Sequence, residues 1–352
     1  AFLAAVLKGV HKHAGMMPAG ISGSGNEHRL GANEAPPAII SVFMGESLTG
    51  MIEAIIHEKG PLHAEDEMMK LGISRIPEIK RDSTDRNRTS PFAFTGSKFE
   101  FRAVGASQSI AFPIALLNAA VAEAIGEVAA DLRQELQKTP EVDDAVLKVV
   151  RRAFKATSAV RFDGNNYSEE WVVEAEKRGL PNLKRSPDAL AQLVTPSSRK
   201  CLTTLKILTE EELQSRYHVR LERYIKDIMI EMSTMREMVD TLVLPAAFEY
   251  HGSLVDTVAK AKSARLVAVP QVDAANALGK KIKELQKQRA VMEKVIDKAE
   301  SMHEDMEECA QYLTHQGADA MEKVRAAADA IEVMVDDDCW PLPKYREMLF
   351  PV

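Results

Sequence analysis

Lys98-Phe99-Glu100-Phe101-Arg102 decides the fold of the first part of the chain, because charged and apolar residues alternate strictly along it. A period of two predicts a β-strand, in which successive side chains point to opposite faces of a sheet. Lys98, Glu100 and Arg102 then share one face, while the two phenylalanines anchor the other face in a core. We expect Glu100 to be held ionised by its two cationic neighbours.

Two segments upstream of this strand mix arginines with turn formers and apolar residues. They are His28-Arg29-Leu30-Gly31-Ala32-Asn33-Glu34-Ala35-Pro36-Pro37 and Asp85-Arg86-Asn87-Arg88-Thr89-Ser90-Pro91-Phe92-Ala93-Phe94. Guanidinium groups bind carboxylates and phosphates in bidentate fashion, and a carboxylate is a hard ligand for Mg²⁺ or Mn²⁺. A surface loop is the ordinary interpretation of such charges, but the interleaved phenylalanines need burial. The composition therefore favours a pocket for anions and a metal ion.

Length and composition limit the class of protein. A chain of 352 residues permits one or two domains, and 45% hydrophobic with 28% charged residues is typical of a soluble globular protein. The net charge of -7 argues against a general nucleic-acid binder. No apolar run is expected to be long enough to span a bilayer. Three widely spaced cysteines form no disulfide framework, which favours a reducing cytosol and a cytoplasmic protein.

The first thirteen residues are predicted to be the middle of an apolar helix, and we expect a chain truncated at its N-terminus. His11 and His13 lie on this helix, where a structural or surface role is the better interpretation than a metal ligand. Residues 38–44 form a short apolar run that fits either a buried strand or the start of a helix.

From about residue 106 the apolar spacing becomes helical. Ser168 and Thr209 are each followed by acidic residues in a capping pattern, and Pro245 should kink a helix or start a new one. Helices are predicted over 110–136, 141–157, 168–178, 186–194 and 209–250.

A heptad-like apolar stripe predicts one arm of an antiparallel helical hairpin, with 317–335 or 253–266 as the returning arm. Arg289 and His303 interrupt the stripe, and its methionines are interpreted as core residues rather than a binding groove. The stripe consists of Leu278, Ile282, Leu285, Met292, Ile296, Ala299, Met306, Ala310 and Leu313.

The motifs at 28–37, 85–94 and 98–102 resemble those of glutamine synthetase, and the fuller pattern resembles the type III branch of that family. The resemblance implies an α+β fold. Residues 1–240 would be the C-terminal part of the catalytic domain, with antiparallel active-site strands, packed helices and a helix-rich part after 106. Residues 241–352 would be a helical extension of type III kind that contains the helical hairpin.

The resemblance also implies roles for the cations of the three motifs. Arg29 matches the arginine that binds the substrate glutamate, and Arg88 matches one that contacts the transferring phosphate. Lys98 lies where the family has a basic residue near the nucleotide. Arg102 matches the arginine at the reacting carboxylate and phosphoryl group, which is both a catalytic and a substrate-binding position.

Two carboxylates complete the implied site. Glu34 matches the loop glutamate that closes the site and helps take a proton from ammonium, and Glu100 matches a metal ligand. The implied cofactors are ATP and Mg²⁺ or Mn²⁺, and the implied reaction makes glutamine from glutamate and ammonia through γ-glutamyl phosphate. The family's other metal ligands lie upstream of everything present here, and Ala93 stands where the bacterial type I branch has an arginine.

Two other functions stay open. The chain could be a non-catalytic oligomerisation or interaction module derived from the same fold, or a ligase that joins glutamate to an amine other than ammonia. In all three interpretations we expect no nucleic-acid or membrane partner. The resemblance implies a homo-oligomer, a dodecamer of two hexameric rings.

Overall fold

The computed structural model describes residues 1–31, 35, 38–58, 68–69, 79–80, 89–95, 98–105, 108–302 and 305–349. The chain divides into two compact units, Ala1–Arg220 and Leu221–Val352. This division lies earlier in the chain than the domain boundary at 240 predicted from the sequence, and that boundary stays a prediction. The structure is mostly helical with a small three-stranded sheet, as a glutamine-synthetase-like C-terminal part would require.

Unit 1 contains both sheets and most of the helices. Its elements are α1 (Phe2–Lys12), α2 (Met16–Ile21), β1 (Val42–Phe43), α3 (Glu46–Ile56), β2 (Met68–Met69), β3 (Ile79–Lys80), β4 (Phe92–Phe94), β5 (Phe99–Phe101), α4 (Ala111–Leu136), α5 (Val142–Ala156), η1 (Ser158–Val160), α6 (Glu169–Lys177), α7 (Ser186–Ala191), η2 (Gln192–Val194), α8 (Pro196–Thr204) and the beginning of α9 (Glu210–Met238).

The three-stranded sheet has the order β1-β4-β5. β4 and β5 are antiparallel, with Ala93 opposite Glu100, whereas β1 and β4 are parallel. The charged strand β5 thus pairs antiparallel with β4, and its identity as an active-site strand stays a prediction. Within 38–44 only Val42–Phe43 forms a strand, which pairs with β4, and Val42 also bridges to Arg161, so the run is not the start of a helix.

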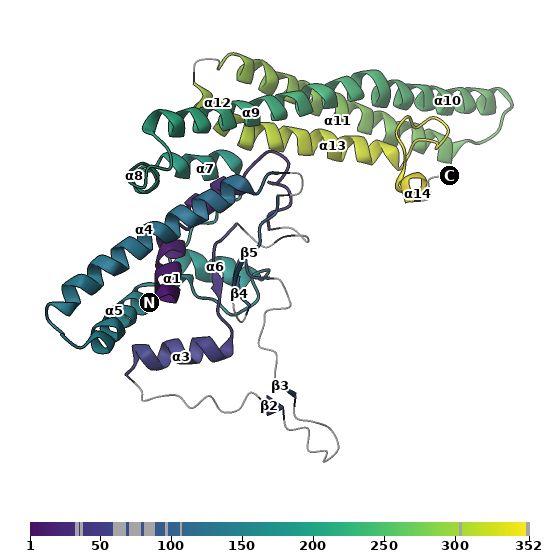
Figure 1. Cartoon of the computed structure of the whole chain (residues 1–352). Coiled ribbons are helices and arrows are strands. Elements are labelled where there is room, and N and C mark those ends of the chain that lie inside the picture. Colours follow the sequence, from purple (N-terminus) through teal and green to yellow (C-terminus); the bar gives the residue numbers. More distant parts are fainter. Residues whose placement is uncertain are drawn as a thin grey trace. The chain divides into compact units, whose positions relative to one another are not determined.

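Helix α4 is the centre of the helical part of unit 1, and α1, α2 and α5 pack against it (Figure 1). Ala5, Val128 and Val149 form a buried cluster where α1, α4 and α5 meet. Gly9 lets α1 approach α4 closely, since a Cβ built there would lie 2.6 Å from the backbone oxygen of Ala120. The apolar first helix predicted from the sequence is thus an ordered core element.

By length and composition alone, α4 could also cross a membrane. The expectation that no apolar segment is long enough is wrong by that criterion. The core helix of a folded domain passes the same test; α1, α2, α5 and α8 pack against α4, and 28% of the tested window is buried. The absence of a membrane partner stays a prediction.

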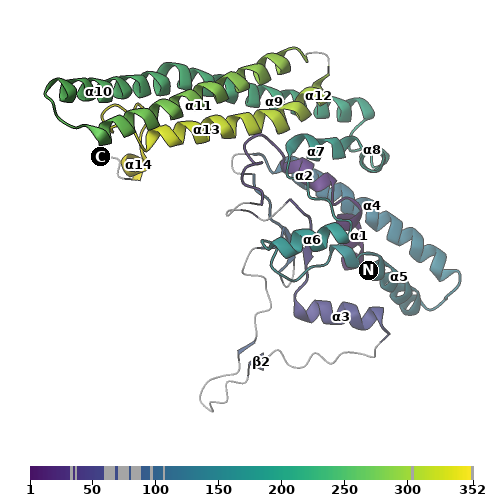
Figure 2. The same ribbon diagram turned by 180° about the vertical axis from the view of Figure 1, so that it is seen from behind.

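Unit 2 consists of long helices, which run side by side in Figures 1 and 2. Its elements are the remainder of α9, η3 (Val239–Val243), α10 (Leu244–Ser263), α11 (Val269–Glu300), α12 (Met306–Tyr312), η4 (Leu313–Gly317), α13 (Ala318–Glu332) and α14 (Tyr345–Leu349). Pro245 lies in the first turn of α10, after a π-helical turn, so a new helix starts there as predicted.

The apolar stripe of unit 2 is divided between two helices, because α11 ends at Glu300 and α12 begins at Met306. The expectation of one continuous arm is wrong at this point. Both candidates for the returning arm lie beside it, since α10 and α13 each pack against α11. Arg289 interrupts the stripe because its guanidinium forms ion pairs with Asp240 at 2.6 Å and Glu293 at 2.8 Å. His303 lies outside the described residues.

Candidate active site

The face of β5 that was predicted to carry charge does so. The Glu100 carboxylate lies between its two neighbours, with Lys98 Nζ 3.2 Å from Oε1 and Arg102 Nη2 3.1 Å from Oε2. Arg102 Nε donates a second hydrogen bond to the same Oε2 at 3.3 Å. The hydrogen bonds from Lys98 and Arg102 hold the pKa of Glu100 below its ordinary value. The carboxylate is therefore ionised throughout the neutral range.

The opposite face of the same strand is aromatic. Phe99 stacks on Phe92 with ring centroids 4.9 Å apart, and it meets the edge of Phe94 at 5.3 Å. Phe92 is 2% exposed, so this cluster ties β5 to β4 through apolar contacts. Apolar packing on one face fixes the register of the strand and thereby the direction of the charges on the other.

The three charged side chains differ in exposure, and this difference bears on what each can do. The Lys98 side chain is 68% exposed, Glu100 is 36% exposed and Arg102 is 19% exposed. Arg102 also lines a small cavity of about 50 Å³ together with Leu30, Asn26 and Val104. The guanidinium of Arg102 is thus fixed by Glu100 at the edge of a cavity, while the exposed ammonium of Lys98 can reorient toward a ligand.

The turn that carries Arg29 is tied to the end of β5. Asn26 is 3% exposed, its side-chain amide donates to the carbonyl of Val104 at 2.9 Å, and its own carbonyl accepts from the backbone N–H of Arg29 at 3.0 Å. Leu30, the next residue, lines the same cavity as Arg102. The structure therefore brings the Arg29 turn to the charged strand. Glu34 and Arg88 lie outside the described residues.

Sequence reasoning missed the polar residues that hold these segments. Glu27 is 7% exposed, and its carboxylate accepts from the backbone N–H of Ser186, at the start of α7. Ser41, Asn166 and Ser90 form a buried chain: Ser41 Oγ donates to Asn166 Oδ1 at 2.7 Å, and Asn166 Nδ2 donates to Ser90 Oγ at 3.2 Å. Their partners are distant in sequence, so no local pattern marks them.

Known proteins that are similar to this chain point to the same family as its motifs. A family model described as the glutamine synthetase C-terminal domain matches residues 145–262. A glutamine synthetase of Bacteroides fragilis (strain YCH46) is 36% identical over 359 residues, which is 99% of this chain and 49% of the relative. A type-3 glutamine synthetase of Dictyostelium discoideum is 37% identical over 362 residues, which is 99% of this chain and 48% of the relative. The chain is thus similar to glutamine synthetases, including a type-3 enzyme, along nearly its whole length.

The chain spans about half the length of the relatives that it matches. The similarity to these relatives covers both compact units. The match to the family model is shorter and extends from α5 into α10. The resemblance read from the motifs is thereby confirmed at the level of the family. The roles of individual residues are a separate matter and stay predictions.

Proposed function

We propose that this chain supplies part of the active site of an ATP-dependent ligase, which joins glutamate and ammonia into glutamine through γ-glutamyl phosphate. The observation that carries the proposal is the ionised Glu100 between Lys98 and Arg102, on one face of a strand, in a chain that is similar to glutamine synthetases along nearly its whole length. The remaining metal ligands would come from outside this chain.

Cations are the main requirement of this chemistry, because the reaction moves negative charge among a carboxylate, a phosphoryl group and a leaving diphosphate. Arg102 suits the reacting centre, since Glu100 and partial burial hold its planar guanidinium in place. Lys98 suits a nucleotide phosphate, since its exposed ammonium can follow a ligand. Arg88 is assigned to the phosphate by its motif alone.

Glu100 fits a Mg²⁺ or Mn²⁺ ligand, because it is an ionised hard oxygen donor that is one-third exposed. Mg²⁺ is commonly held by one or two carboxylates together with substrate phosphates. When bound, such an ion neutralises charge on the phosphoryl groups. Lys98 and Arg102 keep the Glu100 carboxylate ionised and oriented for that role.

Arg29 is proposed to bind the carboxylate of the substrate glutamate, at the turn that Asn26 fixes to the end of β5. Glu34 is proposed to close the site and to take a proton from ammonium. A closing loop is useful here because an acyl phosphate must be kept from water. A cytoplasmic homo-oligomer, a dodecamer of two hexameric rings, is proposed from the resemblance.

The test is glutamine formation by the full-length protein that contains this chain, with ATP, glutamate and ammonia and with Mg²⁺ or Mn²⁺. Glu100→Gln keeps the size of the side chain and removes its charge. It should lower turnover at least about 100-fold, since the loss of even an outer-shell partner of a metal costs about 10–100-fold.

Glu135→Gln is the matched control. Glu135 is also a carboxylate held by two cations, with Arg152 Nη1 at 2.8 Å and Lys148 Nζ at 3.8 Å, and its pKa is likewise lowered, chiefly by the hydrogen bond from Arg152. It lies at the end of α4 rather than on β5, so this variant should retain activity. An inactive wild type would favour the non-catalytic module, and turnover with another amine alone would favour the sister ligase.

A further inference from the structure

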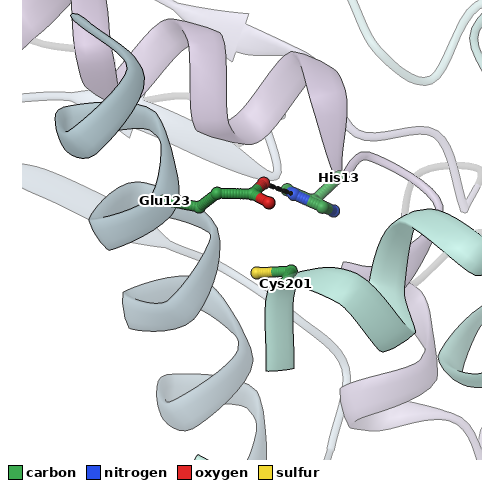
Figure 3. Close-up of side chains that lie close together, drawn as sticks. All are labelled: His13, Glu123 and Cys201. Carbon is green, nitrogen blue, oxygen red and sulfur yellow. Dashed lines mark hydrogen bonds and ion pairs between the residues drawn. The ribbon is translucent and has the colours of Figure 1, made fainter. Parts of the chain in front are cut away.

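Three side chains from separate parts of unit 1 lie close together. They are His13 at the end of α1, Glu123 on α4 and Cys201 on α8 (Figure 3). One ligand atom from each lies within 4.8 Å of the others. His13 is 2% exposed, Cys201 is fully buried, and the Glu123 side chain is 15% exposed. The cluster is therefore closed on the protein side and reaches solvent through Glu123.

The hydrogen bonds of the cluster leave two of its donor atoms unused. His13 Nε2 lies 2.6 Å from Glu123 Oε2, and Lys12 Nζ lies 2.7 Å from the same oxygen. Within the part of the chain that the structure describes, neither Glu123 Oε1 nor the Cys201 thiol has a hydrogen-bond partner. The Glu123 side chain reaches solvent and the Cys201 sulfur is fully buried beside it, so both atoms are available to one ligand.

The donor set has a definite metal preference. Imidazole, thiolate and carboxylate together are ligands of Zn²⁺, and the sulfur disfavours Mg²⁺ and Mn²⁺. The charges also balance, since a thiolate and a carboxylate neutralise one Zn²⁺. Lys12 stays compensated, because its ammonium also pairs with Glu127 at 2.6 Å. Ligands at about 2.0–2.3 Å from Zn²⁺ require only a small contraction of the present cluster.

We propose that His13, Glu123 and Cys201 form a Zn²⁺ site that fastens α1 and α8 to α4. Glu123 contributes Oε1 while Oε2 keeps Lys12, and a water at the solvent side takes the fourth position. On binding, the S–H bond of Cys201 breaks, a sulfur–zinc bond forms and the proton leaves to solvent. His13 contributes Nε2, whose hydrogen bond to Glu123 Oε2 breaks and whose proton moves to Nδ1. This site is independent of the proposed ligase chemistry, which uses β5 and a hard cation.

The test uses the full chain after treatment with a chelator, and Zn²⁺ as the added probe. We expect one tightly bound Zn²⁺ per chain and a higher melting temperature with Zn²⁺ but not with equal Mg²⁺. Cys201→Ser and His13→Gln should each weaken Zn²⁺ binding more than about 100-fold, beyond the effect of losing an outer-shell partner.

Cys309→Ser is the matched control, because Cys309 is also a buried thiol but bonds the carbonyl of Ala299 in unit 2. It should bind Zn²⁺ as the wild type does. Binding that survives Cys201→Ser, or no binding to the wild type, would overturn the proposal. Should the variants fail to fold, Co²⁺ added to the wild type must give a thiolate-to-cobalt charge-transfer band, and its absence would overturn the proposal equally.

Discussion

Gly9→Ala should destabilise unit 1, although alanine is the better helix former. Gly9 lies within α1, and an added Cβ would meet the backbone oxygen of Ala120 at 2.6 Å and its carbonyl carbon at 2.9 Å. Both atoms belong to the main chain of α4, so no side chain can rotate away. The two helices must separate, and the contacts between Ala5 and Val128 loosen with them.

The magnitude follows from two opposing terms. Overpacking a close contact costs about 1–3 kcal/mol, and the backbone obstacle places Gly9→Ala in the upper half of that range. The gain in helix propensity from glycine to alanine is about 1 kcal/mol. The net loss should be about 1–2 kcal/mol, which for a unit of this size lowers the melting temperature by about 2–4 °C per kcal/mol.

Urea unfolding monitored by circular dichroism measures this change, with Gly126→Ala as the matched control. Gly126 lies on the exposed side of α4, and no atom of the described chain lies within 4 Å of its added Cβ. That variant should be more stable than the wild type by up to about 1 kcal/mol. If Gly9→Ala were as stable as Gly126→Ala, the close approach of α1 and α4 would be refuted.

Three further predictions concern the ligand turn, a helix cap and acid stability. Arg29→Ala in the full-length protein should raise the KM for glutamate more than that for ATP, and an unchanged glutamate titration would reject its role. Ser168→Ala removes the hydroxyl that accepts from the Trp171 N–H and should cost α6 about 1 kcal/mol in urea unfolding, whereas no loss would show that the cap contributes nothing. Burial raises the pKa of Glu127, but hydrogen bonds from Lys12 and Lys8 outweigh burial and leave the pKa below its ordinary value of 4.5. The stabilisation of the fold by this ionised carboxylate is therefore present above pH 4.5 and is lost as the pH falls below that value. Glu127→Gln should therefore lose less stability than the wild type between pH 5 and pH 3, and parallel curves would contradict the assignment.

Local patterns predicted the elements that depend on near neighbours. The alternation at 98–102 gave the charged face of β5, since a strand needs only its own side-chain period to present it. Ser168 and Thr209 marked the starts of helices because a cap is formed within one turn, and both capping hydrogen bonds are present. The motif at 28–37 led to the family without any knowledge of packing.

Such local patterns could not predict contacts between residues that are distant in the sequence. The parallel pairing of β1 with β4 depends on a connection of some fifty residues, and short apolar runs do not encode direction. His13 was interpreted as an ordinary helical histidine because Glu123, its partner, is 110 residues away. Arg289 looked like a defect in an apolar stripe until the structure placed Asp240 beside it.

Magnesium dependence of glutamine formation by the full-length protein tests the central claim most directly, since that claim puts Glu100 of the charged strand in contact with the metal. The account predicts that Glu100→Gln needs far more Mg²⁺ for any turnover, while Glu135→Gln follows the wild-type titration. Wild-type turnover by Glu100→Gln at limiting Mg²⁺ would contradict it.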